Sequence, residues 1–298
     1  MIALRVFGKM FFERYIKDPL QFAWSDPKKI FVGGVFQLIS IGGIISGLVI
    51  MFASLIPSLM DIAPELALVT SLGGVLLGFI VATIGVVFTA FIYGYYMRII
   101  ENTLEGSFEL PEWEDFKELL TKGAYFFLGI FILQVIFGII SVIVTAPFVI
   151  LLMLNDGYSN LLIFNIFMNL VSFVLSVIEA LYITLATINF VDKKKFMGFF
   201  DLKEVVSKIS IEYVLVLVAV ALVSILVVIP VIIILLIPVL IGIFTQNVFL
   251  MIAIALIVLA MPFLQMFLTV FGYRSYSNYF LSKKESILEE NTDFENNE

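Results

Sequence analysis

The 298-residue sequence contains neither cysteine nor histidine. Without cysteine the chain forms no disulfide bonds and offers no thiol nucleophile, and without histidine as well it has no thiolate or imidazole ligands for a metal. Histidine is also the side chain whose ordinary pKa lies closest to neutral pH. Acid–base chemistry would therefore fall to carboxylates, tyrosine or lysine. No nucleophile–base pair and no metal-ligand set is visible, so we predict no enzymatic activity and no cofactor.

Charged residues are also scarce. They make up 14% of the chain, whereas hydrophobic residues make up 62%. Soluble domains are typically about 25% charged and 45–50% apolar. Several apolar runs reach the ~20 residues that a helix needs to cross a bilayer. The composition therefore predicts an integral membrane protein. The net charge of −7 comes partly from an acidic C-terminal segment and argues against a nucleic-acid partner.

The apolar runs predict an all-α transmembrane bundle of six helices, built of three helical hairpins. The predicted spans are residues 30–56, 66–97, 124–154, 161–191, 213–244 and 248–273. Together they make a transmembrane domain over residues 30–276. Residues 1–29 are predicted to be an interfacial helix and linker, and residues 277–298 an acidic, disordered tail.

Two polar segments have the pattern of amphipathic helices that lie in the membrane interface. Charged residues recur every four positions over residues 5–17, opposite an apolar face, and Asp18-Pro19 is predicted to end that helix. A second short interfacial helix is predicted from Pro111 to Gly123. We expect such helices on the cytoplasmic face.

The basic residues predict the orientation. All 17 lysines and arginines lie in the N-terminal segment, the two long loops and the C-terminal segment, and none lies in the three short turns. Basic loops stay on the cytoplasmic side. We therefore predict a multi-pass protein of the cell membrane with cytoplasmic N- and C-termini. The tyrosines and arginines of Gly94–Arg98 and Gly272–Tyr276 are predicted to anchor span ends in the headgroup region.

An internal repeat supports the hairpin arrangement. Residues Asp115–Lys122 match Asp201–Lys208 in kind at every position, 86 positions apart, and Asp26–Phe31 resembles a weaker first copy. Each stretch precedes a span, a tight turn and a returning span. Since any interface helix mixes charged and apolar residues, part of the similarity can arise without a repeat.

One acidic residue, Glu179, lies well inside a predicted span. A charge there costs several kcal/mol unless it is paired, hydrated or neutralised. It ends a polar stripe that follows one helix face at intervals of three and four residues: Asn165, Asn169, Ser172, Ser176 and Glu179. We expect this face to point into the bundle or a hydrated cavity.

Three glutamines, Gln37, Gln134 and Gln265, lie at a depth similar to that of Glu179 in other spans. Together the four side chains would form one polar layer. Two interpretations stay open: a substrate or proton site in which Glu179 titrates, or interhelical hydrogen bonding with a permanently neutral Glu179.

Small residues recur four apart in the first two spans, at Gly43 and Gly47 and at Gly74 and Gly78. Such glycines let helix backbones approach closely. They favour close packing of the first hairpin, and a homo-oligomer through the same residues is the alternative.

Two motifs resemble a known family. The first is Pro-Leu-Gln-Phe-Ala-Trp-Ser-Asp-Pro at 19–27, followed by Gly33-Gly34. The second is Gly94-Tyr95, Gly106, Leu-Pro-Glu-Trp-Glu-Asp at 110–115, and Gly123. Over residues 19–275 the sequence resembles an uncharacterised family of multi-pass membrane proteins, found mainly in archaea and some bacteria and catalogued as domain of unknown function 4013. The resemblance implies a membrane location and no particular activity, so it assigns no functional residue.

Two classes of function remain. The sequence slightly favours a non-enzymatic membrane scaffold, assembly factor or lipid-associated component, with membrane lipids as its expected partners. The alternative is a small-solute or proton-coupled transporter or channel that uses Glu179.

Overall fold

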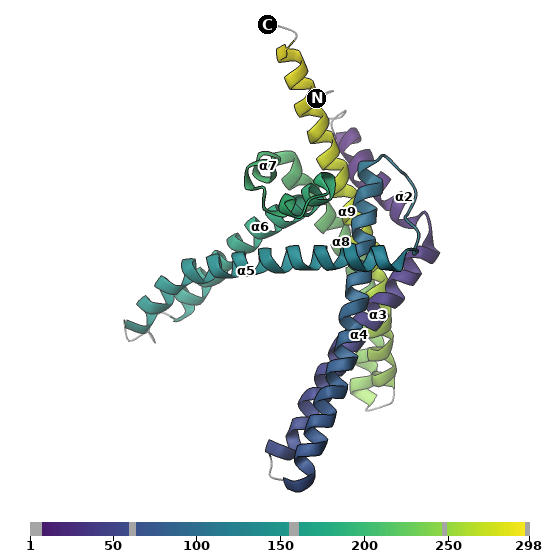
Figure 1. Cartoon of the computed structure of the whole chain (residues 1–298), viewed down its shortest axis with the longest axis vertical. Coiled ribbons are helices and arrows are strands. Elements are labelled where there is room, and N and C mark those ends of the chain that lie inside the picture. The colour runs from purple at the N-terminus through teal and green to yellow at the C-terminus, as the bar shows by residue number, and fades with distance from the viewer. Residues whose placement is uncertain (1–7, 60–63, 155–160, 246–248, 296–298) are drawn as a thin grey trace. The chain divides into compact units, whose positions relative to one another are not determined.

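The computed structural model describes residues 8–59, 64–154, 161–245 and 249–295, and these ranges hold helices and connecting loops but no strand. Six of the helices are long and apolar enough to cross a membrane (Figure 1). They are α3 (Pro27–Leu59), α4 (Pro64–Leu104), α5 (Phe116–Leu154), α6 (Leu161–Lys193), α8 (Ile211–Thr245) and α9 (Phe249–Glu295). The all-helical class and the six candidate spans are confirmed.

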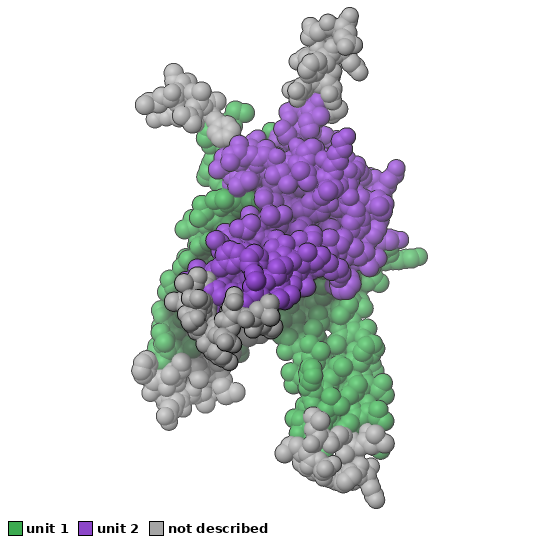
Figure 2. Space-filling view, turned by 90° about the vertical axis from the view of Figure 1, so that its left-hand side faces the viewer, with its two compact units in different colours: residues 1–124, 216–278 green, residues 125–215, 279–298 purple. Residues whose placement is uncertain are grey.

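The chain divides into two compact units, which Figure 2 colours separately. Unit 1 holds residues 1–124 and 216–278, and unit 2 holds residues 125–215 and 279–298. Helices α5, α8 and α9 each contribute residues to both units, so the boundary lies within helices rather than in loops.

Helices α3 and α4 of unit 1 lie side by side and antiparallel (Figure 1). The hydroxyls of Ser40 and Thr89 share a hydrogen bond of 2.6 Å, and the Ser71 hydroxyl donates to the Ser54 carbonyl at 2.8 Å. A methyl group added to any of four glycines on these helices would meet the neighbouring helix: Gly43, Gly47, Gly74 and Gly78. The glycines therefore lie at a close contact within this helix pair. Their use in a homo-oligomer stays a prediction.

The N-terminal segment is helical from residue 8 to Trp24. The prediction that Asp18-Pro19 ends this helix is wrong. A π-helical turn, η1 (Glu13–Lys17), precedes α2 (Asp18–Trp24), which carries Pro19 in its first turn. Proline lacks an N–H and its ring clashes with the carbonyl four residues earlier. The wider π turn changes the hydrogen-bond pattern at that place, and the helix continues.

The loop between α4 and α5 is followed by one uninterrupted helix. Residues Pro111–Asp115 are not helical, and α5 begins at Phe116 and continues through Gly123 into the apolar span. The predicted short helix from Pro111 to Gly123 is therefore wrong. Gly123 lies inside α5. Its missing side chain allows α5 to pass close to α4 rather than ending the helix.

Unit 2 contains two short helices after α6, η2 (Phe196–Phe200) and α7 (Leu202–Ser207). The Asp201 carboxylate caps α7 by accepting the Glu204 backbone N–H at 3.3 Å. Helix α9 extends to Glu295, so the segment predicted to be disordered from residue 277 is helical over its described length. Lysine and glutamate are good helix formers, and extending an existing helix needs no new nucleus.

Candidate functional site

The polar stripe of α6 is an exposed face of that helix. Asn165, Asn169, Ser172 and Ser176 are exposed, and Glu179 is half-buried. The Ser176 hydroxyl donates to the Ser172 carbonyl at 2.9 Å, within the same helix. Glu179 forms no ion pair within the described part of the chain. The stripe offers amide, hydroxyl and carboxyl groups to whatever covers this face.

The three glutamines differ in burial. Gln134 and Gln265 are exposed, whereas Gln37 is buried and its side-chain oxygen has no hydrogen-bond partner among the described residues. Leaving such an atom unsatisfied costs about 1–3 kcal/mol. Gln37 and Gln265 belong to unit 1, and Gln134 and Glu179 to unit 2. The predicted polar layer across four helices therefore stays a prediction.

In unit 1, Arg98 holds the loop that precedes α5. Its guanidinium donates to the carbonyls of Glu112 at 3.1 Å and Glu114 at 2.7 Å, and to the Glu118 carboxylate at 2.5 Å. The same carboxylate accepts Lys122, four residues further along α5, at 2.8 Å. The arginine is buried, so these charged hydrogen bonds fix the loop against the end of α4.

The same loop is held by an aromatic stack. The rings of Tyr95 and Trp113 lie parallel with centroids 3.9 Å apart, and the Tyr95 hydroxyl donates to the Pro111 carbonyl at 3.1 Å. The Trp113 indole donates to the Lys29 carbonyl at 2.9 Å, and the Lys29 ammonium donates to the Leu110 carbonyl at 2.7 Å. Trp113 of the Leu110–Asp115 motif thus holds the start of α3, the end of α4 and the loop together.

Helices α4 and α5 cross at a point where only glycine fits. A methyl group at Gly94 would overlap the Leu119 backbone, and one at Gly123 would overlap the Ala90 carbonyl. Both obstacles are main-chain atoms, which cannot rotate away. The two glycines therefore bring the start of α5 against α4 and place Glu118 within reach of Arg98.

In unit 2 a corresponding set of contacts holds η2 and α7. Lys193, the last residue of α6, donates to the Asp201 carboxylate at 2.6 Å and also pairs with Glu204. Glu204 in turn accepts the buried Lys208 ammonium at 2.7 Å. The backbone carbonyl of Lys208 accepts the Tyr279 hydroxyl at 2.5 Å. These contacts tie α7 to the end of α6 and to α9.

The ion pairs of α7 shift the pKa values of both carboxyls downward. For Asp201 the first cause of the lower pKa is the hydrogen bond from Lys193, and the second is the Glu204 backbone N–H. For Glu204 burial raises the pKa, but the hydrogen bonds from Lys193 and Lys208 outweigh it, and the pKa is lowered. Both groups are therefore held ionised as parts of the tether.

The contacts of the two polar segments correspond pair by pair. Tyr95 donates its hydroxyl to a loop carbonyl in unit 1, and Tyr182 donates to the Phe199 carbonyl at 2.9 Å in unit 2. Seven residues after each tyrosine, an asparagine donates to another carbonyl of the same loop. These bonds run from Asn102 to Glu109 at 3.2 Å and from Asn189 to Gly198 at 2.9 Å.

The helices that follow the loops correspond as well. Glu118 and Glu204 occupy equal places in the repeat. Each carboxylate pairs with a cationic side chain of the preceding long helix, α4 or α6, and with a lysine four residues later. Leu119 and Val205, the next residues, are both fully buried. The structure therefore supports the sequence repeat, because residues that match in the two copies make the same kinds of contact.

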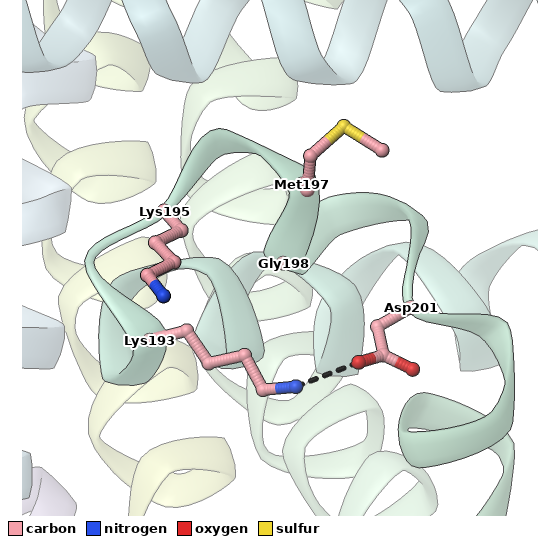
Figure 3. Close-up of a pocket in the computed structure, with 5 residues that line it drawn as sticks. All are labelled: Lys193, Lys195, Met197, Gly198 and Asp201. Carbon is pink, nitrogen blue, oxygen red and sulfur yellow. Dashed lines mark hydrogen bonds and ion pairs between the residues drawn. The ribbon is translucent and has the colours of Figure 1, made fainter.

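The segment between α6 and α7 also forms an open basic hollow of about 420 Å³, lined by Lys193, Lys195, Met197, Gly198 and Asp201. Figure 3 shows the Lys193 side chain directed at Asp201, whereas the Lys195 side chain has no dashed contact to another residue drawn. The described residues contain no group of three acidic side chains that would hold a metal ion.

Three of the residues predicted as headgroup anchors have another role. Tyr95, Arg98 and Arg274 are buried. Arg274 donates to the Asp18 carboxylate at 3.1 Å and to the Ser107 carbonyl at 2.7 Å. The anchor interpretation is wrong for these side chains, since protein atoms take up their hydrogen bonds. The sequence marks these residues only as polar side chains near the ends of apolar runs, and it does not indicate their partners.

Six helices that are long and apolar enough to cross a membrane are the pattern of a helical membrane protein. The family model described as "Protein of unknown function (DUF4013)" matches residues 77–238, more than half of the chain, and the chain belongs to this family. The predicted family resemblance is confirmed; the match includes the second motif, whereas the first motif, at residues 19–34, lies outside it. The matched region includes the Arg98 contacts, the α6 stripe and the α7 tether.

Two relatives come from Methanocaldococcus jannaschii. Uncharacterized protein MJ1189 is 30% identical over 217 residues, which cover 68% of this chain and 71% of the relative. Uncharacterized protein MJ0233 is 29% identical over 185 residues, which cover 60% of this chain and 65% of the relative. No solved structure matches the chain. The names of these relatives state no activity.

Proposed function

We propose that this protein is a non-enzymatic scaffold or assembly component of the cell membrane, and that it binds a transmembrane helix of another protein through the polar stripe of α6. In this proposal the six spans form three hairpins. Their interfacial segments and both termini lie on the cytoplasmic side.

The observation that carries the proposal is the exposure of four of the five stripe residues, Asn165, Asn169, Ser172 and Ser176. In hydrocarbon, polar groups without partners are costly, so this face favours a polar covering over acyl chains. Interhelical hydrogen bonds in membranes contribute about 0.6 kcal/mol each, or roughly 3 kcal/mol for five side chains. Asparagine amides both donate and accept, so a helix that presents amides or hydroxyls fits the stripe.

The polar segments support a structural role. The Arg98 guanidinium is directed at two loop carbonyls and a carboxylate, and Lys193 and Lys208 are directed at carboxylates of their own unit. Groups engaged in this way hold the chain's own loops. They favour a scaffold over a binding site for a charged substrate.

A transporter is the second candidate, because Glu179 is half-buried and is the one acidic residue deep in a span. A proton-flux assay on reconstituted protein decides between the two. The scaffold proposal expects no flux that differs between the wild type and Glu179→Gln. A flux that Glu179→Gln abolishes would refute it.

Helix binding is tested by cross-linking on the naturally cysteine-free chain. Ser172→Cys places a thiol in the stripe, and Val174→Cys is a matched control about 200° around the same helix. Both native residues are exposed. In native membranes, a thiol-reactive benzophenone, which inserts into C–H bonds on illumination, should give a defined adduct with another protein at position 172 and none at 174. An adduct within the chain, an adduct between two copies, or equal labelling at both positions would contradict the proposal.

The orientation has its own test. Asp156 is outside the described residues, and the sequence predicts it in a short outer turn; Asp156→Cys should react with an impermeant maleimide added from outside the cell. Reaction from the cytoplasmic side alone would reverse the orientation.

A further inference from the structure

A second feature of unit 2 is an apolar groove of about 640 Å³. Helices α5 and α6 form one side of it through Phe137, Ile178 and Tyr182, and η2 and α7 form the other through Phe200, Leu202 and Val206. Its volume lies within the range of about 300–1,000 Å³ that small-molecule sites occupy. The groove thus connects two spans with the polar segment that follows them.

The groove presents almost no polar atoms. Every lining residue is an aliphatic or aromatic hydrophobe apart from Tyr182, and the Tyr182 hydroxyl is bound to the Phe199 carbonyl at 2.9 Å. The tyrosine therefore offers its ring rather than a free hydroxyl. Such a lining suits a hydrocarbon chain and gives a polar ligand nothing to bind.

Ion pairs hold helix α7 in place, and one apolar face of this helix is exposed. Leu202 and Val206, one helical turn apart, are 64% and 49% exposed and both line the groove. Asp201 and Glu204 are held by Lys193 and Lys208, as described above. The tether therefore fixes the orientation of the exposed apolar pair. In a segment rich in charged residues, such a surface points to an apolar partner.

The basic hollow shares the η2–α7 junction with the groove. Asp201 lines the hollow, and its neighbours Phe200 and Leu202 line the groove. Lys195 lines the hollow and, unlike Lys193, forms no ion pair within the described part of the chain. Basic side chains beside an apolar surface at the end of a span are suited to anionic headgroups.

We propose that this groove binds one acyl chain of an anionic membrane lipid, whose headgroup is held at Lys195. The apolar lining takes the chain, and the free ammonium supplies the charge complement. The proposal rests on the groove and on Lys195 of the basic hollow, and it does not depend on what covers the α6 stripe.

The test measures lipid retention by the full-length protein. Protein purified in detergent is loaded with dioleoyl phosphatidylglycerol or dioleoyl phosphatidylcholine, and bound lipid is counted by native mass spectrometry. The wild type should retain one phosphatidylglycerol. Ile178→Trp fills the groove and should reduce retention at least tenfold, whereas Ile166→Trp, an exposed site of α6 outside the groove, should retain lipid normally.

Two further variants keep the test decisive if Ile178→Trp fails to fold. Val206→Gln puts an amide into the groove from an exposed site and should also reduce retention, whereas Ser207→Gln, the next residue of α7, should not. Lys195→Gln should lower the preference for phosphatidylglycerol over phosphatidylcholine about fivefold. Lys117→Gln, at an exposed lysine of α5, should leave it unchanged.

Equal retention by each groove variant and its control would overturn the proposal. So would equal binding of the two lipids by the wild type. If the chain itself or a second copy covers the groove, a thiol at Val206→Cys will resist maleimide in lipid-free micelles, and that result also overturns it. Failure of the stripe cross-link would leave these readouts unchanged.

Discussion

The close crossing of α4 and α5 predicts that a single methyl group added at Gly123 destabilises the protein. In Gly123→Ala the new methyl would overlap the Ala90 carbonyl. Overpacking costs about 1–3 kcal/mol, and a main-chain obstacle places this case at the upper end of that range. The helices must separate, which also draws Glu118 away from Arg98, so we expect a loss of about 3 kcal/mol in the free energy of unfolding.

The matched control lies on the same helix. Gly138 has no atom within 4 Å of an added methyl, so Gly138→Ala meets open space. Alanine is a better helix former than glycine by about 0.8–1.0 kcal/mol, so this variant should be slightly stabilised. Unfolding of both variants in mixed micelles, followed by helical circular dichroism, checks the opposite signs. If Gly123→Ala were as stable as Gly138→Ala, the glycine crossing would not be a tight contact.

Two further predictions concern the polar segments. Arg98→Met should make the loop over residues 105–115 sensitive to protease and cost about 1.5–3 kcal/mol, because the two loop carbonyls and the Glu118 carboxylate lose their charged donor; Lys117→Met, at an exposed site, should change neither. Since the pKa values of Asp201 and Glu204 are lowered, their contribution to stability is complete above the ordinary carboxyl pKa of about 4 and is lost as pH falls through the lowered values. The protection of the Val205 amide, taken as its exchange rate relative to that of an unstructured peptide at the same pH, should therefore fall below about pH 4, and unchanged protection there would contradict the tether.

The spans could be predicted from the sequence because a long apolar run has few alternatives to a membrane helix. The predictions made at Pro19 and Gly123 failed for a common reason. Both residues are strong local signals for a helix end, and both are overridden by their surroundings. At Pro19 a π turn alters the backbone pattern, and at Gly123 a neighbouring helix requires the missing side chain.

The candidate site could be predicted only as a list of residues on one helix face. Periodicity places Asn165 to Glu179 on one side of α6, but it does not say what lies opposite, since that depends on segments distant in sequence. The polar contacts of Arg98 and Asn189 were missed for the same reason. Their partners are loop carbonyls, and every residue has a carbonyl, so the sequence gives no sign of the pairing.

The π turn at Glu13–Lys17 determines the direction in which the side chains of α2 point around the helix axis. A π turn contains one residue more than the α-helical turn it replaces, and one residue corresponds to about 100° of helix rotation. The Asp18 carboxylate accepts both Arg274 and Asn278 in this orientation. A one-residue deletion within the turn would leave a regular helix but rotate Asp18 away from both partners. The position of Asp18 therefore depends on the number of residues in the π turn more than on which residues these are.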